Sequence, residues 1–185
     1  MQNKKILLAV TGSIAAYKTA NLIRLLVKNG AIVQVIMTET ATDFITPLTL
    51  ATLSKNPVLI DYQKNKRSGE WNNHVELGLW ADILLIAPCT ANTLAKLAIG
   101  LCDNLLMAVY LSARCSVFIA PAMDLDMYVH PTTLRNIATL QSFPKHYIIE
   151  ATSGELASGL SGQGRMEEPE KIVEIVETFF QKNRV

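Results

Sequence analysis

The stretch from residue 6 to residue 37, ILLAVTGSIAAYKTANLIRLLVKNGAIVQVIM, decides the fold. It contains two apolar runs, 6–10 and 32–37, the second interrupted only by Gln34, and such runs are typical of strands buried on both faces. Between them, residues 14–29 carry leucines at helical spacing, and Gly30 follows where a helix would end. The stretch therefore predicts a strand, a helix and a second strand, the unit from which parallel sheets are built.

The same pattern continues along the chain. Residues 82–87 and 117–120 are two further apolar runs, each preceded by a helix-like segment. We expect short strands at 58–60 and 147–149 to extend the sheet, and a closing helix over 170–181. The predicted fold class is therefore α/β, with a mainly parallel sheet between helices.

The composition fits one domain over residues 1–185. Half of the residues are hydrophobic and the mean hydropathy is +0.24, yet no apolar run approaches the roughly 18 residues that span a bilayer. We therefore expect subunit interfaces rather than a membrane partner. Seventeen basic residues against sixteen acidic ones give no electrostatic reason to expect a nucleic-acid partner.

The N-terminus and the cysteines bear on location. The first apolar run stops after five residues, so we interpret it as a strand and not as a signal peptide, and we expect a cytoplasmic protein. Cys89, Cys102 and Cys115 form no CxxC pair, which indicates neither a disulfide framework nor a zinc site. We expect reduced, largely buried thiols and no metal.

Polar turns follow the predicted strands, at the edge of the sheet where ligands bind in such folds. Thr11, Gly12 and Ser13 offer backbone N–H groups and hydroxyls before a helix, which suits a phosphate, although Ser13 could equally be a helix cap. The segment Thr90–Thr93 repeats this arrangement. Two such turns without a GxGxxG motif favour a mononucleotide over a dinucleotide.

Two side chains are candidates for chemistry. His74 opens a predicted helix over residues 74–80 and could transfer a proton, but from the residues alone a capping or merely exposed histidine is the better explanation. Asp124 follows the predicted strand at 117–120 and could cap a helix, carry a surface charge or bind a substrate. The residues alone leave these alternatives open.

Residues 153–166 form a glycine-rich segment. They include Gly154, Gly159, Gly162 and Gly164, together with the hydroxyl of Ser158. Glycine allows backbone angles that other residues avoid, so we expect a flexible loop that closes over a substrate.

Taken in order, these turns resemble those of the flavin-dependent cysteine decarboxylases, over about residues 4–169. The motifs that carry the resemblance are GSIAAYK at 12–18, NHVEL at 73–77, PCTANT at 88–93, PAMDLDMY at 121–128 and the glycine-rich segment. Each motif is weak alone, but their order is specific.

The resemblance implies a flavodoxin-like, Rossmann-type three-layer fold that binds FMN and assembles as a homotrimer or dodecamer with active sites between subunits. It implies that the flavin is held by Gly12, Ser13, Ile14, Thr38, Phe44, Thr90, Ala91, Asn92, Thr93 and Ala122. It further implies catalytic roles for His74 and for the position of Ser158, and substrate binding by Met123, Asp124, Ala157 and Arg165.

The chemistry of such enzymes explains why a flavin is needed. Oxidation of the cysteine unit gives a thioaldehyde that can lose CO2, and the resulting enethiolate is then reduced and protonated. Within the family, the match is closest to members that convert 4'-phosphopantothenoylcysteine to 4'-phosphopantetheine in coenzyme A synthesis. A phosphopantothenate–cysteine ligase, fused or separate, is the expected partner.

Two residues depart from the family pattern. Asp124 replaces an asparagine that contacts the substrate carboxylate, and Ser158 replaces a cysteine that acts as an acid in the final reduction. The serine favours a peptidyl-cysteine decarboxylase that releases an enethiol, whereas the rest of the glycine-rich segment favours the coenzyme A enzyme. A non-catalytic regulatory flavoprotein is disfavoured by His74, and a flavin prenyltransferase by the motif at 121–128.

Overall fold

In the computed structural model, which describes residues 1–65 and 67–183, five parallel strands form the central sheet. Their order is β2-β1-β5-β6-β7. Their bounds are Lys5–Val10 for β1, Ile32–Met37 for β2, Ile83–Cys89 for β5, Ser116–Pro121 for β6 and His146–Ile148 for β7. The predicted α/β class is confirmed.

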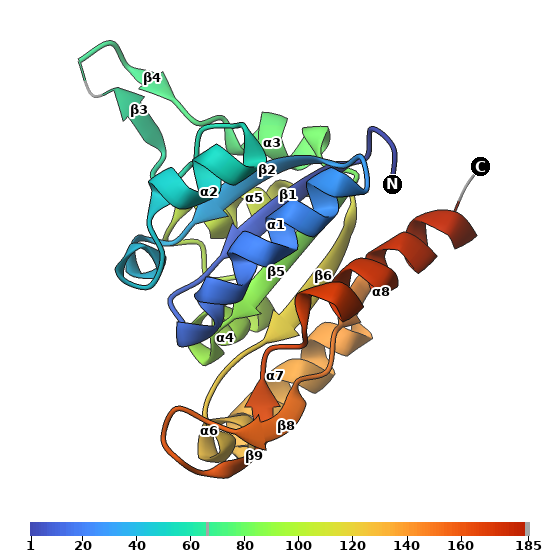
Figure 1. Ribbon diagram of the computed structural model, residues 1–185. Coiled ribbons are helices and arrows are strands. Elements are labelled where there is room, and N and C mark those ends of the chain that lie inside the picture. The colour runs from blue at the N-terminus through green and yellow to red at the C-terminus, as the bar shows by residue number, and fades with distance from the viewer. Residues whose placement is uncertain (66, 184–185) are drawn as a thin grey trace.

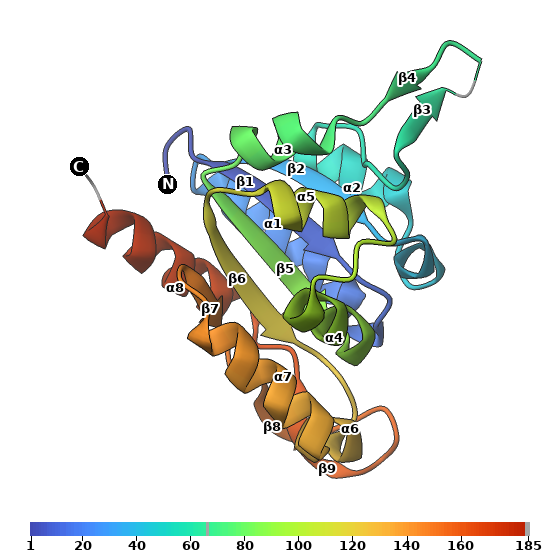
Figure 2. The same ribbon diagram turned by 180° about the vertical axis from the view of Figure 1, so that it is seen from behind.

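Helices cover both faces of the sheet (Figures 1 and 2). One face carries α1 (Thr19–Lys28), α2 (Pro47–Ser54) and α8 (Pro169–Lys182). The other carries α3 (His74–Trp80), α4 (Ala91–Ile99), α5 (Leu105–Ser112) and α7 (Pro131–Ser142). Strand β1 explains why the apolar runs are continuous, because Ile6 and Leu8 enter one core and Leu7 the other.

The sequence located most elements but not all of their details. The helix predicted over 14–29 begins as a 3-10 turn, η1 (Ile14–Lys18), before α1. Residues 58–60 do not form a strand, since only Leu59 bridges to Ile36 of β2. A 3-10 turn, η2 (Glu39–Asp43), and a short helix, α6 (Leu125–Val129), were not predicted.

The glycine-rich segment is an antiparallel ribbon rather than a loop. Strands β8 (Thr152–Glu155) and β9 (Ser161–Arg165) pair, and residues 156–160 turn between them beside α6 (Figure 1). Of its glycines, Gly159 has a positive φ of 84°, as a turn requires. The others serve close packing: a Cβ at Gly162 would lie 2.6 Å from Leu125 Cδ1, and one at Gly164 would overlap the Met123 carbonyl.

A second ribbon projects from the body of the protein (Figures 1 and 2). It is formed by β3 (Gln63–Asn65) and β4 (Glu70–Trp71) and leads into α3.

The cysteines are less uniform than predicted: Cys89 is buried and Cys115 half-buried, but Cys102 is exposed. Within the described residues, no helix combines the length and apolar character needed to cross a bilayer.

Candidate functional site

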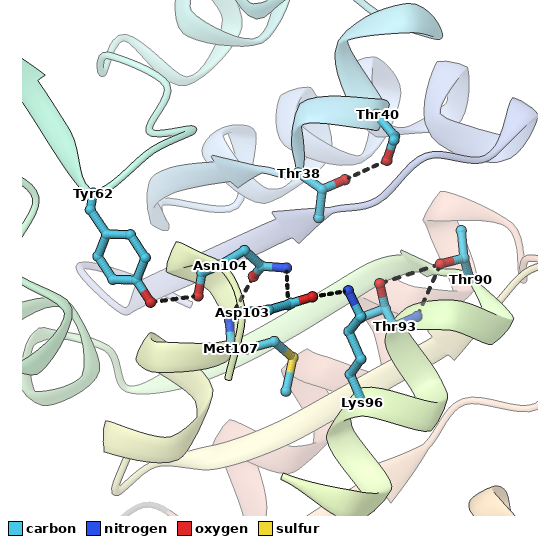
Figure 3. Close-up of polar contacts among 9 residues, drawn as sticks. All are labelled: Thr38, Thr40, Tyr62, Thr90, Thr93, Lys96, Asp103, Asn104 and Met107. Carbon is cyan, nitrogen blue, oxygen red and sulfur yellow. Dashed lines mark hydrogen bonds and ion pairs between the residues drawn. The ribbon is translucent and has the colours of Figure 1, made fainter. Parts of the chain in front are cut away.

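The segments that follow β1, β2, β5 and β6 line two cavities at the carboxyl edge of the sheet. The first, which we call the threonine cavity, has a volume of about 410 Å³ and is lined by Thr38, Thr40, Thr90, Asn92 and Thr93 among others. Figure 3 shows the four threonines. The second, the hairpin cavity, has a volume of about 560 Å³ and lies between the end of β6 and the β8–β9 ribbon.

The threonine cavity is built from helix caps. Thr90 precedes α4, and its hydroxyl accepts a hydrogen bond from the Thr93 N–H at 3.3 Å (Figure 3). The Thr90 N–H in turn donates to the buried Thr11 hydroxyl, which donates to the Pro88 carbonyl at 2.8 Å. These bonds fix the end of β5 against the end of β1, so the N-terminus of α4 points at the cavity in a defined position.

The opposite wall carries the residues after β2. The Thr38 and Thr40 hydroxyls lie 3.2 Å apart, and an added Cβ at Gly12 would lie 2.6 Å from Thr40 Oγ1. Gly12 is therefore required by the close approach of two turns. Hydroxyls on two walls and one helix N-terminus are donors that suit a phosphate. Glu39, Asp61 and Asp103 also line the cavity, and Asp103 is paired with Lys96.

Sequence reasoning missed part of the threonine cavity. Lys96 of α4 pairs with Asp103, and Asn104 caps α5 by accepting from the Met107 N–H at 3.0 Å (Figure 3). Tyr62 donates to the Asn104 carbonyl at 3.0 Å. Only the fold brings these side chains to the cavity, because they belong to segments that follow different elements.

Seven of the predicted site residues line the hairpin cavity: Ser13, Ile14, Ala122, Met123, Asp124, Ala157 and Arg165. Ser13 also caps η1, since its hydroxyl accepts from the Ala15 N–H at 3.2 Å. Asp124 stands at the N-cap position of α6 but makes no capping hydrogen bond, so capping does not explain this carboxylate. Glu155, which the sequence did not single out, lines the same cavity.

A buried ammonium group connects the ribbon to η1. Lys18, at the end of η1, is only 6% exposed and donates to the Met166 carbonyl at 2.9 Å. It also pairs with Glu168 at 2.7 Å, and Arg165 lies 3.7 Å from the same carboxylate oxygen. The base of the ribbon is therefore tied to the segment that follows Ser13.

His74 lies in neither cavity. It begins α3, but Asn73 caps this helix by accepting from the Val75 and Glu76 N–H groups, so His74 is not the cap. Its ring packs edge-on against Trp71 and Tyr62, with centroids 5.7 and 6.3 Å away. Its Nδ1 is buried without a hydrogen-bond partner in the described part of the chain. Tyr62 contacts the His74 ring and also lines the threonine cavity, so it connects His74 to the edge of that cavity.

The remaining predicted residues occupy other places. Ala91 begins α4, and Phe44 ends η2 with 45% of its surface exposed. Ser158 is exposed in the turn of the ribbon, where its hydroxyl accepts from the Leu160 N–H at 3.4 Å. The structure therefore gathers most of the predicted residues at one edge and leaves five outside the linings of the two cavities: Gly12, Phe44, His74, Ala91 and Ser158.

This arrangement can be compared with known proteins. The sequence matches the flavoprotein family over residues 1–181. The chain belongs to the flavoprotein family. The resemblance to flavin-dependent cysteine decarboxylases is confirmed by the relatives that follow, and so is the prediction of a flavin.

Two relatives of this flavoprotein illustrate the range of the family. One is a cysteine/cysteine sulfinic acid decarboxylase from an unknown prokaryotic organism, 62% identical over 76% of the chain and 39% of the relative. The other is a probable phosphopantothenoylcysteine decarboxylase of Streptococcus mutans, 46% identical over 94% of the chain and 97% of the relative. The flavoprotein also spans 44% of the Bacillus subtilis bifunctional coenzyme A biosynthesis protein, at 43% identity over 97% of this chain.

Among solved structures, the flavoprotein is similar to a cysteine-to-serine mutant of PPC decarboxylase complexed with pantothenoylaminoethenethiol. The TM-score is 0.85 at 35% identity, covering 97% of this chain and all of the other. This likeness confirms the predicted flavodoxin-like fold. The chain spans less than half the length of the cysteine/cysteine sulfinic acid decarboxylase and less than half the length of the Bacillus subtilis protein.

Proposed function

We propose that this protein is an FMN-dependent decarboxylase of cysteine carboxylates and that its substrate is 4'-phosphopantothenoylcysteine, converted to 4'-phosphopantetheine. The observation that carries the proposal is the pair of cavities at one sheet edge, one lined by threonine hydroxyls and the N-terminus of α4 and one closed by a glycine ribbon. The Streptococcus mutans relative, which matches over nearly its whole length, supports the substrate.

The threonine cavity suits the FMN phosphate and ribityl chain. The hydroxyls of Thr38 and Thr90 and the N-terminus of α4 converge there, and Gly12 leaves room for the approach of the two walls. A solved neighbour described as an FMN-binding protein, at 34% identity and a TM-score of 0.83, supports this cofactor. When bound, the flavin would accept and return the electrons that make the cysteine carboxylate able to lose CO2.

The residues of this chain would bind and enclose the substrate. The hairpin cavity offers Arg165 as a cation for a carboxylate, and the β8–β9 ribbon would exclude water above it. Because His74 lies in neither cavity of its own chain, it would move a proton at a substrate held by a neighbouring subunit of the proposed homotrimer. Its buried Nδ1, which has no hydrogen-bond partner among the described residues, supports a polar role because buried polar atoms seldom lack a partner.

Ser158 would leave the last reduction slow. A hydroxyl is a far weaker acid than a thiol, whose reference pKa is about 8.5. The solved neighbour in which a cysteine is changed to serine is complexed with an ethenethiol, which supports this expectation for a chain that carries serine. We therefore propose that part of the product leaves two hydrogens short of phosphopantetheine. The bound flavin would then keep those two electrons, and an external oxidant such as O2 would be needed before the next turnover.

The active unit is proposed to be a homotrimer or a multiple of it. Val75 and Leu79 of α3 and Leu111 of α5 are 45 to 54% exposed, on two helices that pack against each other. Exposed apolar side chains in such a group are typical of a subunit interface. Light scattering after gel filtration measures the assembly.

A cytoplasmic location and a ligase partner stay predictions.

The function is tested with protein reconstituted with FMN. Incubation with 4'-phosphopantothenoylcysteine should release CO2, and mass spectrometry of the product should show phosphopantetheine together with a species two hydrogens lighter. The absence of CO2 from this substrate, with FMN bound, would refute the proposed function.

A further inference from the structure

A third cavity, which we call the amide cavity, lies beside β2, the outermost strand of the sheet. Its volume is about 530 Å³, which is within the range of ligand pockets. Its walls come from the first half of β2, the segment 56–59, the end of the β3–β4 ribbon and α3. None of the described residues that line it lines the threonine cavity or the hairpin cavity. The amide cavity is therefore separate from the proposed flavin and substrate sites.

Three amide side chains that line this cavity are oriented by the backbone. Gln34, Asn56 and Asn72 each donate their NH2 group to a backbone carbonyl, at 2.7, 2.8 and 2.6 Å respectively. The amide atom nearest a carbonyl oxygen must be the donor, so the oxygen is the atom left over in each side chain. Within residues 1–65 and 67–183, none of these three oxygens accepts a hydrogen bond. Asn73 differs, since its oxygen caps α3 and its NH2 group remains.

Asn72 gives independent evidence for a ligand. The residue lines the amide cavity and is only 6% exposed. Its Oδ1 is one of the two buried side-chain atoms that have no hydrogen-bond partner among the described residues. Burial of an acceptor without a donor is costly, and buried polar groups are rarely left in this state. A donor bound beside Asn72 would remove this cost.

The charge of the amide cavity favours a cation. Glu76 of α3 lines it, and its carboxylate makes no hydrogen bond or ion pair within the described part of the chain. None of the described lining residues is basic. Both tryptophans of the chain, Trp71 and Trp80, also line the cavity, and the faces of indole rings attract cations. The Lys5 ammonium group already lies 5.8 Å from the centre of the Trp80 ring, so Trp71, which is 48% exposed, is the indole available to a ligand.

We propose that the amide cavity binds a guanidinium group. This cation is planar and carries five N–H donors, so it can bond several oxygens at once and stack on an indole. Its acceptors are the three amide oxygens and the Glu76 carboxylate, and its stacking surface is Trp71. A phosphate or a carboxylate would meet acceptors there and be repelled. The inference therefore goes beyond the proposed function and does not depend on it.

Tryptophan fluorescence reports binding at this cavity, because Trp71 and Trp80 are the two tryptophans of the chain. FMN-loaded protein is titrated with agmatine, L-arginine and L-citrulline. The emission should change in a saturable way with agmatine and with L-arginine. L-citrulline has nearly the shape of L-arginine but an uncharged ureido group, so it should bind at least about tenfold more weakly.

A fourth compound distinguishes the two sources of a guanidinium group. N-acetyl-L-arginine methylamide represents an arginine within a polypeptide, whereas agmatine is a free small molecule. Tighter binding of the methylamide supports a site for the arginine side chain of a polypeptide partner, and tighter binding of agmatine supports a site for a small molecule. Both results support the guanidinium site.

Variants locate the binding site. Asn72→Ala removes the buried acceptor and should weaken agmatine binding about tenfold. Glu76→Gln removes a charge at an exposed position and should weaken it about threefold. Asp126→Asn removes an exposed carboxylate of α6 that lines none of the three cavities, and it should bind agmatine as the wild type does. Glu76→Gln leaves the backbone bonds of the cavity intact, so it tests the site even where Asn72→Ala does not fold.

Three results would overturn the inference. The first is the absence of a saturable fluorescence change with agmatine and with both arginine compounds. The second is equal affinity for L-arginine and L-citrulline, because the cavity would then not select a charge. The third is wild-type affinity for agmatine in Glu76→Gln, which would place the cation elsewhere. Release of CO2 from phosphopantothenoylcysteine is measured separately, so the proposed function stands or fails on its own.

Discussion

The two cavities lie at the same sheet edge but are constructed differently. The walls of the threonine cavity follow strands β2 and β5, and buried bonds through Thr11 join the ends of β1 and β5. The hairpin cavity has a wall that is a two-stranded ribbon outside the main sheet. Its ties to the body include Lys18 and the bond between Met123 and Gly164.

The difference teaches that one cavity depends on the strand ends of the central sheet, whereas the other depends on a ribbon outside that sheet. A cofactor site whose walls are strand ends changes only if the sheet changes. A substrate site closed by an added ribbon can change its chemistry by single substitutions, because few other contacts depend on them. Asp124 and Ser158, the two departures from the family pattern, both lie at the ribbon side.

The largest effect is expected at His74, which neither cavity contains. His74→Asn should lower the rate of CO2 release about 10²-fold or more, because proton transfer by a positioned side chain contributes roughly 10²–10⁴-fold to a rate. FMN should stay bound, since the threonine cavity is intact. His130→Asn is the matched control, because asparagine can still cap α7. Normal decarboxylation by the His74 variant would refute its role.

Loss of the buried tie to the ribbon should be the next largest effect. Lys18→Met leaves Glu168 and the Met166 carbonyl without their donor, and we expect a destabilisation of about 2 kcal/mol because Glu168 is half exposed. For a chain of this size that lowers the melting temperature by roughly 4–8 °C.

Limited proteolysis sharpens this prediction, since cleavage should increase within residues 152–165 and not elsewhere. Lys171→Met, which removes an exposed ion pair to Glu174, is the control and should leave the cleavage pattern unchanged. Uniform destabilisation of the whole domain would show that the ribbon is not separately tied by Lys18.

The threonine cavity should respond through cofactor affinity. Thr90→Val removes the hydroxyl that caps α4 and faces the cavity, so FMN affinity should fall about tenfold, with a loss of stability of about 1 kcal/mol. Flavin fluorescence during titration of the apoprotein measures this. Thr42→Val removes a hydroxyl that bonds only the Glu39 carbonyl, and its FMN affinity should equal that of the wild type.

The smallest change is expected in the turn of the ribbon. Ser158→Cys should raise the share of fully reduced product, because a thiol donates a proton more readily than a hydroxyl, while the rate of CO2 release stays the same. Mass spectrometry of the product reports the ratio. Ser161→Cys places a thiol at the start of β9 and serves as the control. An unchanged ratio in the Ser158 variant would place the acid elsewhere.

Much of the fold was predictable because the central strands are buried on both faces. Continuous apolar runs such as 6–10 and 83–87 have no other favourable place, and the turns after them must lie at one sheet edge. The same reasoning placed Thr90 and Thr93 at that edge correctly, where Thr38, which the family resemblance supplied, lines the same cavity. It missed the paired strands within residues 153–166, because a high glycine content was interpreted as a loop, whereas Gly162 and Gly164 lie in β9 and allow its close approach to Leu125 and Met123.

By itself, the sequence determined the α/β sheet, the polar edge and the family motifs, since each depends on local order along the chain. Only the tertiary structure decided which side chains share a cavity. Glu155 was not predicted as a site residue, because nothing in the sequence around it indicates a binding role. Asp124 was ambiguous, because a carboxylate that caps a helix and one that binds a ligand can follow a strand in the same way. The contacts of α6 and Met123 with β9 resolved both, because they bring the two carboxylates to one cavity.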